Sequence, residues 1–358
     1  MRILIYRLFV LLMFCMPLFG CSGQTHPEKD IPDQNEPESP DDNEDTPGKD
    51  TPTKTYPEGV TVTPFTDELG NGDKCSGFIA EVDFTTNEHL KFNVGYEGYK
   101  MTATEFFSRF DRTAASKGKP CIVINGGYFS GATSVSLAVI GGSVRCHNML
   151  SMNWPSDQDA QKTVYPVRST FGQMDDGSFE AQWVYCVRPD FKEYYSFPSA
   201  LGNNEQTGTF MESAPTTETP EGKVWKPAEA IGGGPRLVAD GQNVAEENYW
   251  AEVLDSGGTA GLSRQPRTGI GYTEDGKLIM IVCDGRGMNG SSGFTLSELA
   301  EKFITLGAVD AMNLDGGGSS AMVGKDGTVL NRPSDSGNSA EIVERKIVTA
   351  IVITEMQK

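Results

Sequence analysis

The chain has few basic side chains for its length, and this shortage narrows the classes of ligand that it can bind. Lysine and arginine number 30 in 358 residues, against 49 aspartates and glutamates, which gives a formal net charge of −19. Proteins that bind nucleic acid neutralise the phosphate backbone with clustered lysine and arginine. The composition therefore excludes a nucleic-acid partner, although one local pocket can still be basic and bind a small anion.

Histidine and paired cysteine motifs are also scarce. The three histidines are His26, His89 and His147, and no Cys-x-x-Cys motif accompanies the seven cysteines. Cys146 and His147 are adjacent, and neighbours on an extended chain point to opposite faces. We therefore expect no zinc site. No Gly-x-Ser-x-Gly motif accompanies the histidines, so a Ser-His-Asp hydrolase is not indicated.

The cysteines that follow the N-terminal segment are five, an odd number. Cys121 and Cys283 occur in apolar stretches typical of strands, and we expect them to be buried thiols. The spacing leaves open whether two of Cys75, Cys146 and Cys186 form a disulfide.

An apolar run at the start of the chain is typical of a secretory signal. Arg2 and Arg7 flank and enter the run, which ends in LFGC at Cys21. This ending resembles a bacterial lipobox, where a peptidase cleaves before the cysteine and lipid is attached to its thiol. An ordinary signal peptide with an incidental cysteine is the alternative. We predict a lipoprotein signal over 1–20 and a cell-envelope protein, periplasmic or on the outer surface, that contacts the membrane through the lipid on Cys21 alone.

Residues 21–57 have the composition of a disordered tether. Positions 22–57 contain ten acidic residues, three lysines, seven prolines and one aliphatic side chain, Ile31. Such a segment buries too little apolar surface to offset the entropy of ordering, and its prolines and charges keep it extended. We predict one folded domain after it, over residues 58–354.

Strand-like stretches outnumber helical ones in residues 58–354. Helices are expected at 102–118, where phenylalanines recur at helical spacing, and at 295–307, where Thr295 and Glu298 form a capping box. Because the strands do not alternate regularly with helices, we predict an α+β fold, a single domain with a mixed, partly antiparallel sheet flanked by helices. The expected strands are 60–65, 121–125, 163–172, 182–188, 267–273, 277–284, 309–315, 327–331 and 347–354.

Four of the apolar stretches end in glycine-rich turns that carry an acid, an amide or an arginine. They are CIVINGGYF (121–129), AIGGGPRLV (230–238), LIMIVCDGRG (278–287) and AMNLDGGGSS (311–320). One such turn is common in any fold. Four of them suggest that polar side chains at the strand ends share one binding rim.

Two Asp-Gly pairs predict hairpins and their registers. A two-residue turn at Asp275-Gly276 would place Arg267 directly opposite Asp284, with the two side chains as neighbours. The alternative for this pair is an ordinary surface ion pair. A second turn at 326–327 would bring the triple glycine close to the NRPSD segment.

The triple glycine, Gly316–Gly318, is costly in conformational entropy and therefore calls for a physical reason. Consecutive glycine amides can form a concave anion site, and Ser319 and Ser320 would add hydroxyl donors. Asp315 at the edge of such a site would act on a sugar hydroxyl, a water or a metal. A tight crossover, where glycine avoids a clash, is the alternative.

With these motifs assembled, residues 115–353 closely resemble the phosphodiester glycosidase domain. The resemblance rests on INGGYF, on PRTGIGYTEDGKLIMIVCDGR, and on GFTLSELAEKFITLGAVDAMNLDGGGSSAMV. The family includes an enzyme that removes N-acetylglucosamine from a phosphodiester. The resemblance implies a hydrolase that cleaves the sugar–phosphate glycosidic bond of a phosphorylated glycan, on the sugar side.

On this resemblance we assign roles to the residues at the rim. Arg267 would bind the phosphate through its bidentate fork, and Asp315 would be base or nucleophile, with Asp284 sharing that role or orienting Arg267. Asn125 and Asn313 would bind sugar hydroxyls or the N-acetyl group. The remaining expected substrate contacts are Gly126, Gly316, Gly317, Gly318, Ser319, Ser320 and, as a reserve phosphate ligand, Arg286.

We expect no cofactor, with Ca²⁺ or Mg²⁺ held by Asp284 and Asp315 as the alternative. Two further functions stay open at the level of sequence. One is a surface lipoprotein that binds glycans without catalysis. The other is a metal-dependent phosphodiesterase that breaks the P–O bond.

Overall fold

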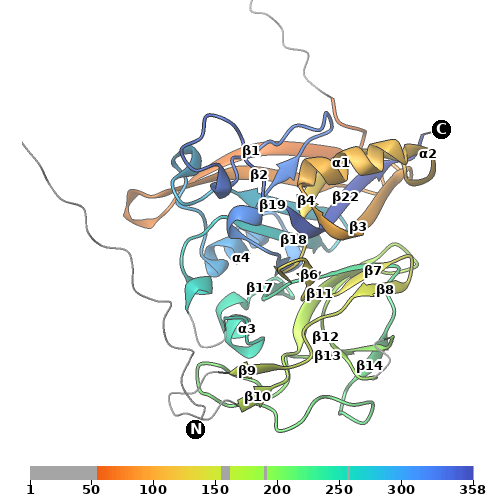
Figure 1. Ribbon diagram of the computed structural model, residues 1–358, viewed down its shortest axis with the longest axis vertical. Coiled ribbons are helices and arrows are strands. Elements are labelled where there is room, and N and C mark those ends of the chain that lie inside the picture. Colours follow the sequence, from red (N-terminus) through yellow and green to blue (C-terminus); the bar gives the residue numbers. More distant parts are fainter. Residues whose placement is uncertain (1–54, 155–161, 189–191, 256–258, 358) are drawn as a thin grey trace, which may run out of the picture. The chain divides into compact units, whose positions relative to one another are not determined.

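The computed structural model describes residues 55–154, 162–188, 192–255 and 259–357 (Figure 1). Contacts group the chain from Thr53 onward into one compact unit. The predicted signal over 1–20, Cys21 and nearly all of the predicted tether lie outside the described residues. Within the described part, every helix is too short or too polar to cross a membrane.

Three antiparallel sheets form the framework of the described residues. The first sheet consists, in spatial order, of β1 (Val60–Glu68), β2 (Lys74–Val82), β19 (Leu278–Cys283), β18 (Arg267–Thr273), β20 (Ala308–Asn313), β16 (Arg236–Ala239) and β17 (Gln242–Asn243). The second sheet consists of β14 (Lys223–Trp225), β13 (Tyr194–Phe197), β12 (Phe179–Cys186), β11 (Arg168–Gln173), β15 (Glu229–Gly232), β7 (Ala138–Ile140) and β8 (Ser143–Cys146). The third sheet consists of β21 (Met322–Val323), β4 (Lys119–Asn125), β22 (Ile347–Glu355) and β3 (Leu90–Met101).

Short elements complete the fold. Two strand pairs stand apart from the sheets: β5 (Phe129–Ser130) with β6 (Thr133–Ser134), and β9 (Met152–Trp154) with β10 (Lys162–Val164). The α-helices of the described residues are α1 (Ala103–Arg112), α2 (Ala114–Lys117), α3 (Ala245–Ala251) and α4 (Leu296–Thr305). The 3₁₀ turns are η1 (Gly70–Gly72), η2 (Ala260–Leu262), η3 (Met288–Gly290), η4 (Gly317–Ser319) and η5 (Ser334–Ser336).

The predicted fold class is confirmed only in its coarse outline, because strands dominate and helices are few. Every strand pair of the described residues is antiparallel, so the parallel part of the predicted mixed sheet is wrong. Antiparallel neighbours need only short turns, whereas parallel neighbours need long crossovers, usually helical. Antiparallel pairing with short turns therefore also accounts for the scarcity of helices.

Both predicted helical segments form, but the one expected at 102–118 is divided at Thr113 into α1 and α2. Thr295 and Glu298 make the reciprocal capping box of α4, and α1 begins with the same arrangement at Thr102 and Glu105. Phe303 of α4 packs over β18 because glycine lines the strand there: a Cβ on Gly269 would lie 2.6 Å from the Phe303 ring. The alternating glycines of RTGIGYT thus make room for a helix.

One hydrophobic cluster joins the three sheets. Fully buried side chains from each sheet pack together in it, including Val82, Met280, Phe171, Ile231, Ile122 and Ile351. Burial of an aliphatic or aromatic side chain of this size contributes roughly 1.5–3 kcal/mol each. This shared core holds the ends of strands from all three sheets near one another, and the site described below lies at those ends.

Both Asp-Gly hairpins form, but each register differs by one residue from the prediction. Arg267 pairs with Cys283, because the loop has three residues and Gly276 takes a φ of 83° at its end. The second loop is built in the same way, with Gly327 at a φ of 78°. A three-residue loop with a left-handed glycine is the next commonest hairpin after the two-residue one. The predicted pairing of Arg267 with Asp284 is therefore wrong.

Five cysteines fall within the described residues, all of them are buried, and none forms a disulfide. This agrees with the expectation for Cys121 and Cys283. Cys75, Cys146 and Cys186 form no disulfide, so the pairing that the spacing left open is absent from the structure.

Candidate functional site

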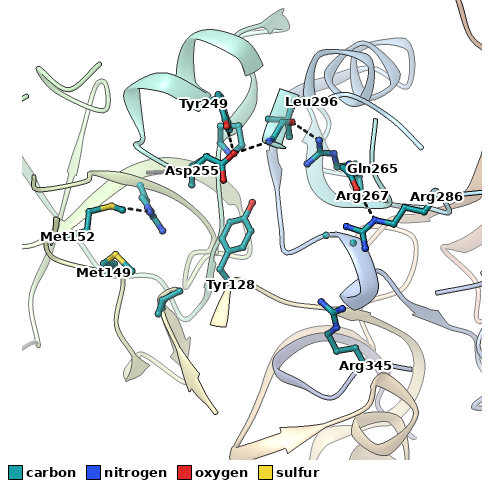
Figure 2. A pocket seen from close by; sticks show the side chains of 17 residues that line it. Tyr128, Met149, Met152, Tyr249, Asp255, Gln265, Arg267, Arg286, Leu296 and Arg345 are labelled. Carbon is teal, nitrogen blue, oxygen red and sulfur yellow. Dashed lines mark hydrogen bonds between the residues drawn. The ribbon is translucent and has the colours of Figure 1, made fainter. Parts of the chain in front are cut away.

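A pocket of about 440 Å³ lies where strand ends and loops of the three sheets meet (Figure 2). Tyr128 follows β4, Gly316 follows β20, and Arg345 precedes β22. Arg168 and Arg267 are the first residues of β11 and β18. The volume is typical of a site for a small organic ligand, and the rim predicted from four strand ends is present in part.

Arginine is the dominant charged residue of the pocket wall. Four guanidinium groups line it, against one carboxylate, that of Asp255. On a chain with a formal net charge of −19, this local excess of positive charge is specific to the pocket. Arginine presents planar, paired donors to phosphate and carboxylate oxygens. The wall therefore suits an anionic ligand. The four arginines are Arg168, Arg267, Arg286 and Arg345.

Arg267 lies at the centre of the predicted site, and backbone carbonyls hold its guanidinium. Nε donates to Phe294 O at 3.1 Å, and Nη2 donates to Gly261 O at 2.6 Å and Ser263 O at 2.8 Å. Its side chain forms no ion pair with a carboxylate of the described residues. Burial lowers the pKa of Arg267, but an arginine side chain stays protonated in proteins. The pocket thus contains a fixed positive charge without a direct counter-charge.

The triple glycine allows two arginines to approach its backbone closely. Gly317 has a φ of 62°, and a Cβ there would lie 3.1 Å from Nη2 of Arg286. A Cβ on Gly318 would lie 2.3 Å from Nη2 of Arg345, which forms a bidentate ion pair with Asp335. The bare backbone therefore provides space for guanidinium groups over the loop, one of the two reasons that the sequence left open.

The amides of the glycine loop are largely occupied within the chain. Gly316 N donates to Asp315 Oδ1 at 2.9 Å, and Gly317 N donates to Pro266 O at 2.9 Å. The loop therefore presents fewer free donors than the predicted anion cradle would need. Gly316 and Gly317 nevertheless line the pocket, whereas Gly318 lies beneath the ion pair of Arg345 and Asp335.

Asp315 lies immediately before the two glycines that line the pocket. Its backbone N donates to Gly126 O at 3.1 Å. Burial raises the pKa of the Asp315 carboxyl to about 6, and the nearby Ser319 hydroxyl and Gly316 amide offset only part of this effect. A carboxyl that titrates near neutrality is suited to proton transfer at physiological pH.

Asn125 holds the backbone of the loop at Asp315 through side-chain hydrogen bonds. Its Nδ2 donates to Asp315 O at 2.7 Å, and its Oδ1 accepts from Thr268 Oγ1 at 2.7 Å and from Ala321 N at 3.2 Å. The side chain is fully buried. These bonds occupy both ends of the amide, so the geometry favours a role in positioning Asp315 rather than the predicted contact with a sugar. Gly126 is needed because a Cβ there would lie 2.4 Å from Thr349 Oγ1.

Asn313 anchors Tyr128, which lines the pocket. Asn313 Nδ2 donates to the Tyr128 hydroxyl at 2.8 Å and to Gly234 O at 2.9 Å, and the Tyr128 hydroxyl donates to Gly234 O at 2.8 Å. Burial raises the pKa of Tyr128, so the phenol stays neutral. Asn313 Oδ1 and Ser320 Oγ are buried and accept or donate no hydrogen bond within the described residues.

Asp284 lies outside the pocket lining, contrary to its predicted role beside Arg267. Its Oδ1 accepts from Arg332 N at 2.7 Å and Asn331 Nδ2 at 3.1 Å, and its Oδ2 accepts from Asn289 Nδ2 at 2.7 Å. Burial raises the pKa of this carboxyl. Asp284 thus ties together the segments on either side of the site. Within the described ranges, no three metal-ligating side chains gather as a metal site would require.

Most of the lining residues, Arg345 among them, were not predicted from the sequence, and three of them show why. Tyr128 stands in the quoted INGGYF motif, where an aromatic residue after a glycine turn was the available signal. Arg168 lies in an expected strand, and nothing in its neighbours distinguishes it from a surface arginine. Asp255, whose Oδ2 accepts from the Tyr249 hydroxyl at 2.7 Å and Gly261 N at 3.2 Å, lies in a loop whose course no local pattern predicts.

Comparison with known proteins identifies a family for the C-terminal half of the chain. Residues 187–354 match the model of the phosphodiester glycosidase family. A Bacillus subtilis protein described as an uncharacterized SPbeta prophage-derived protein, YomE, is 36% identical over 119 residues, which are 33% of this chain and 16% of that protein. The bovine N-acetylglucosamine-1-phosphodiester alpha-N-acetylglucosaminidase is 33% identical over 104 residues, 28% of this chain and 19% of its own length.

A solved structure shares the fold. The catalytic domain of the zebrafish N-acetylglucosamine-1-phosphodiester alpha-N-acetylglucosaminidase, auto-inhibited by its pro-peptide, superposes with a TM-score of 0.54 at 19% identity, covering 85% of each chain. The matched segments span less than a fifth of the length of the two curated relatives. The family that the sequence motifs predict is the family that these comparisons find.

Proposed function

Because residues 187–354 carry the sequence of the phosphodiester glycosidase family, we propose that this chain hydrolyses the sugar–phosphate glycosidic bond of a sugar 1-phosphodiester. The observation that supports this proposal is the placement of Asp315, with a pKa raised to about 6, beside an arginine-lined pocket. An N-acetylglucosamine 1-phosphodiester, the substrate class in the name of the bovine relative, is the first compound to test.

The phosphate of this substrate would bind at the side of the pocket that Arg267 forms. Carbonyls fix the guanidinium of Arg267 in position, so little conformational entropy is lost when an anion binds. Arg286 donates from Nε to Gln265 Oε1 at 2.9 Å and has a φ of 57°. A non-glycine residue held in this region is strained, and such strain clusters at functional sites.

Asp315 would act as the base or the nucleophile of the reaction. The leaving group is a phosphate monoester, a weak base that needs little help from a general acid. The remaining tasks are to stabilise positive charge on the sugar and to activate a water or attack the anomeric carbon. An ionised carboxylate serves both tasks, and Asp315 is ionised above pH 6. Asn125 would hold Asp315 in place through its backbone carbonyl.

The test is hydrolysis of an N-acetylglucosamine 1-phosphodiester in ¹⁸O-labelled water. Label in the sugar supports the glycosidase, and label in the phosphate identifies a phosphodiesterase instead. Binding without turnover identifies a glycan-binding protein. Asp315→Asn should abolish turnover with the fold intact, while Asp176→Asn, at an exposed turn, should leave it unchanged.

We further propose that turnover requires no metal cofactor. The predicted alternative was a divalent cation held by Asp284 and Asp315, but three hydrogen bonds already occupy the Asp284 carboxylate. The rate should therefore be unchanged after dialysis against EDTA. A rate lost to EDTA and restored by Ca²⁺ or Mg²⁺ would contradict this part of the proposal.

We also propose that the chain is a lipid-anchored protein of the bacterial cell envelope. The support is the LFGC sequence that ends at Cys21, followed by an acidic, proline-rich segment. Metabolic labelling with a fatty acid in a bacterial host tests this proposal. Cys21→Ser should remove the label and release the protein from the membrane fraction, whereas Cys15→Ser should do neither.

A further inference from the structure

Arg168 is a buried cation that the proposed phosphate site does not use. Its side chain is 4% exposed, and it lines the pocket. Nη2 donates to Val253 O at 2.9 Å and lies 3.9 Å from Met152 Sδ. Nε has no hydrogen-bond partner among the described residues. A buried charged group with an unsatisfied N–H costs free energy unless a ligand completes it.

No acidic side chain of the described residues forms a direct ion pair with Arg168. Among acidic side chains, Glu252 has the largest electrostatic effect on Arg168. The carboxylate of Glu252, however, already accepts hydrogen bonds from four donors. Ser169 N, Ser169 Oγ, Trp183 Nε1 and Arg236 N all donate to it, at 2.8–3.0 Å. The charge of Arg168 is therefore available to a ligand of the pocket.

Arg168 belongs to the opposite side of the pocket from the other arginines. Figure 2 shows Met149 and Met152 on one side of Tyr128, and Arg168 contacts Met152 on that side. The Tyr128 hydroxyl is bonded to Gly234 O and Asn313, so the ring is a fixed partition between the two sides. On the other side of Tyr128 lie the three remaining arginines of the pocket, Arg267, Arg286 and Arg345.

Arg168 and several lining residues near it in sequence come from a part of the chain that the family model does not match. The match covers residues 187–354, whereas four of the lining residues, Val135, Met149, Met152 and Arg168, precede it. The arginines beyond Tyr128 all lie inside the matched segment. These four residues therefore lie outside the segment that the family model matches, and this side of the pocket is where this chain would select its own substrate.

We propose that Arg168 binds a second anionic group of the substrate, separated from the phosphate site by Tyr128, with Met149 and Met152 packing against the atoms between the two charges. This inference rests on the proposed function and names its substrate class, a sugar phosphodiester that carries a second negative charge. A phosphate or a carboxylate would supply that charge. Either would complete the hydrogen bonding of the guanidinium, which a neutral hydroxyl does more weakly.

Equilibrium binding by the full chain tests the proposal with three ligands that share N-acetylglucosamine. UDP-N-acetylglucosamine carries two phosphates, the methyl diester of N-acetylglucosamine 1-phosphate carries one, and a diester with a carboxyethyl group adds a carboxylate. The unmodified chain should bind the diphosphate or the carboxylate ligand at least tenfold more tightly than the methyl diester. Which of the two binds more tightly identifies the second anion.

Substitutions at the Arg168 wall should remove this preference selectively. Arg168→Met should weaken binding of the doubly charged ligand by about 10- to 100-fold, the usual value of a charge-assisted hydrogen bond, and binding of the methyl diester by less than threefold. Arg168→Lys should restore part of the preference. Arg145→Met makes the same change at an exposed site outside the pocket and should change neither affinity.

A second variant keeps the test valid if Arg168→Met does not fold. Met152 is partly exposed, and Met152→Glu would give Arg168 an internal carboxylate and repel a second anion. It should abolish the preference while leaving Arg168 in place. The proposal would be overturned if Arg168→Met weakened the binding of all three ligands equally, or if the unmodified chain bound all three with equal affinity. It would also be overturned if Met152→Glu left the preference for the doubly charged ligand unchanged. If the chain prefers the doubly charged ligand but hydrolyses none of the ligands, only the proposed hydrolysis is refuted.

Discussion

Single side chains determine the chemistry of this pocket, and Asp315 is the one whose protonation changes near neutral pH. Burial raises its pKa to about 6, so the carboxylate that would act as base or nucleophile is present only above that pH. We expect kcat/KM for an N-acetylglucosamine 1-phosphodiester to rise with pH through about 6 and then to level off, because this ratio reports groups of the free enzyme. Stopped assays from pH 4.5 to 8 measure the profile. A rate that falls through pH 6 would instead make Asp315 a general acid.

The same titration predicts a pH-dependent cost to stability. The folded-state pKa of about 6 lies above the ordinary value of 3.8, so the folded state binds the proton more tightly. Stability from this group is complete below pH 3.8 and is lost as pH rises to about 6. Two pKa units correspond to at most about 3 kcal/mol.

Asp315→Asn removes this cost because an amide does not ionise. We expect its free energy of unfolding to equal that of the unmodified chain at pH 4 and to exceed it at pH 7.5. Urea denaturation at the two pH values measures the difference. An equal difference at both would mean that the pKa is not raised in the folded chain. This variant should thus be more stable and inactive at neutral pH, which separates loss of catalysis from loss of fold.

At the scale of loops and strands, the triple glycine offers a sharp comparison between neighbouring positions. A Cβ on Gly316 would lie 2.8 Å from the Pro266 carbonyl, which the backbone fixes in place. A Cβ on Gly318 would lie 2.0 Å from Asp335 Oδ1 and 2.3 Å from Arg345 Nη2, and both are ends of movable, partly exposed side chains. The two positions therefore respond differently to the same added methyl group.

We expect Gly318→Ala to displace Arg345 from the pocket and to raise KM several-fold, with a loss of stability under about 1 kcal/mol, the value of an exposed ion pair. Gly316→Ala should lower stability by more, because backbone must shift. Thermal melts and steady-state kinetics on both variants measure these effects. Gly202→Ala, where the nearest atom would be 3.8 Å away, is the control. A large stability loss in Gly318→Ala with an unchanged KM would contradict this account of the loop.

Local patterns in the sequence predicted elements well and their exact pairing less well. The capping box at Thr295 located the start of α4 to within one residue, and the alternation of RTGIGYT located both ends of β18. The hairpin register was off by one because an Asp-Gly pair fits a two-residue or a three-residue loop. The two-residue loop needs a positive φ at both residues, whereas here only Gly276 has one and Asp275 does not. That shift placed Asp284 beside Arg267, where the structure does not put it. Residues such as Arg168 and Asp255 reach the pocket through tertiary packing, for which no neighbouring residue is a guide.

At the scale of the whole folded unit, the pocket is held by all three sheets, so ligand binding should stabilise them together. Tyr128 extends from the third sheet, Arg168 begins a strand of the second, and Arg267 begins a strand of the first. A ligand at a hundred times its dissociation constant adds about 2.7 kcal/mol to the free energy of unfolding. Because one hydrophobic cluster also joins the sheets, this energy should not be confined to one of them.

We therefore expect a saturating sugar phosphodiester to raise the melting temperature by several degrees and to slow amide hydrogen exchange near positions 128, 168 and 267 alike. Differential scanning calorimetry and exchange measured by mass spectrometry check the two parts. Arg267→Met should lose both effects, because the ligand no longer bridges the first sheet to the others. Slowed exchange near 267 alone, with residues around 128 and 168 unchanged, would mean that the ligand occupies only one side of the pocket. The three sheets would then share a core but not a binding site.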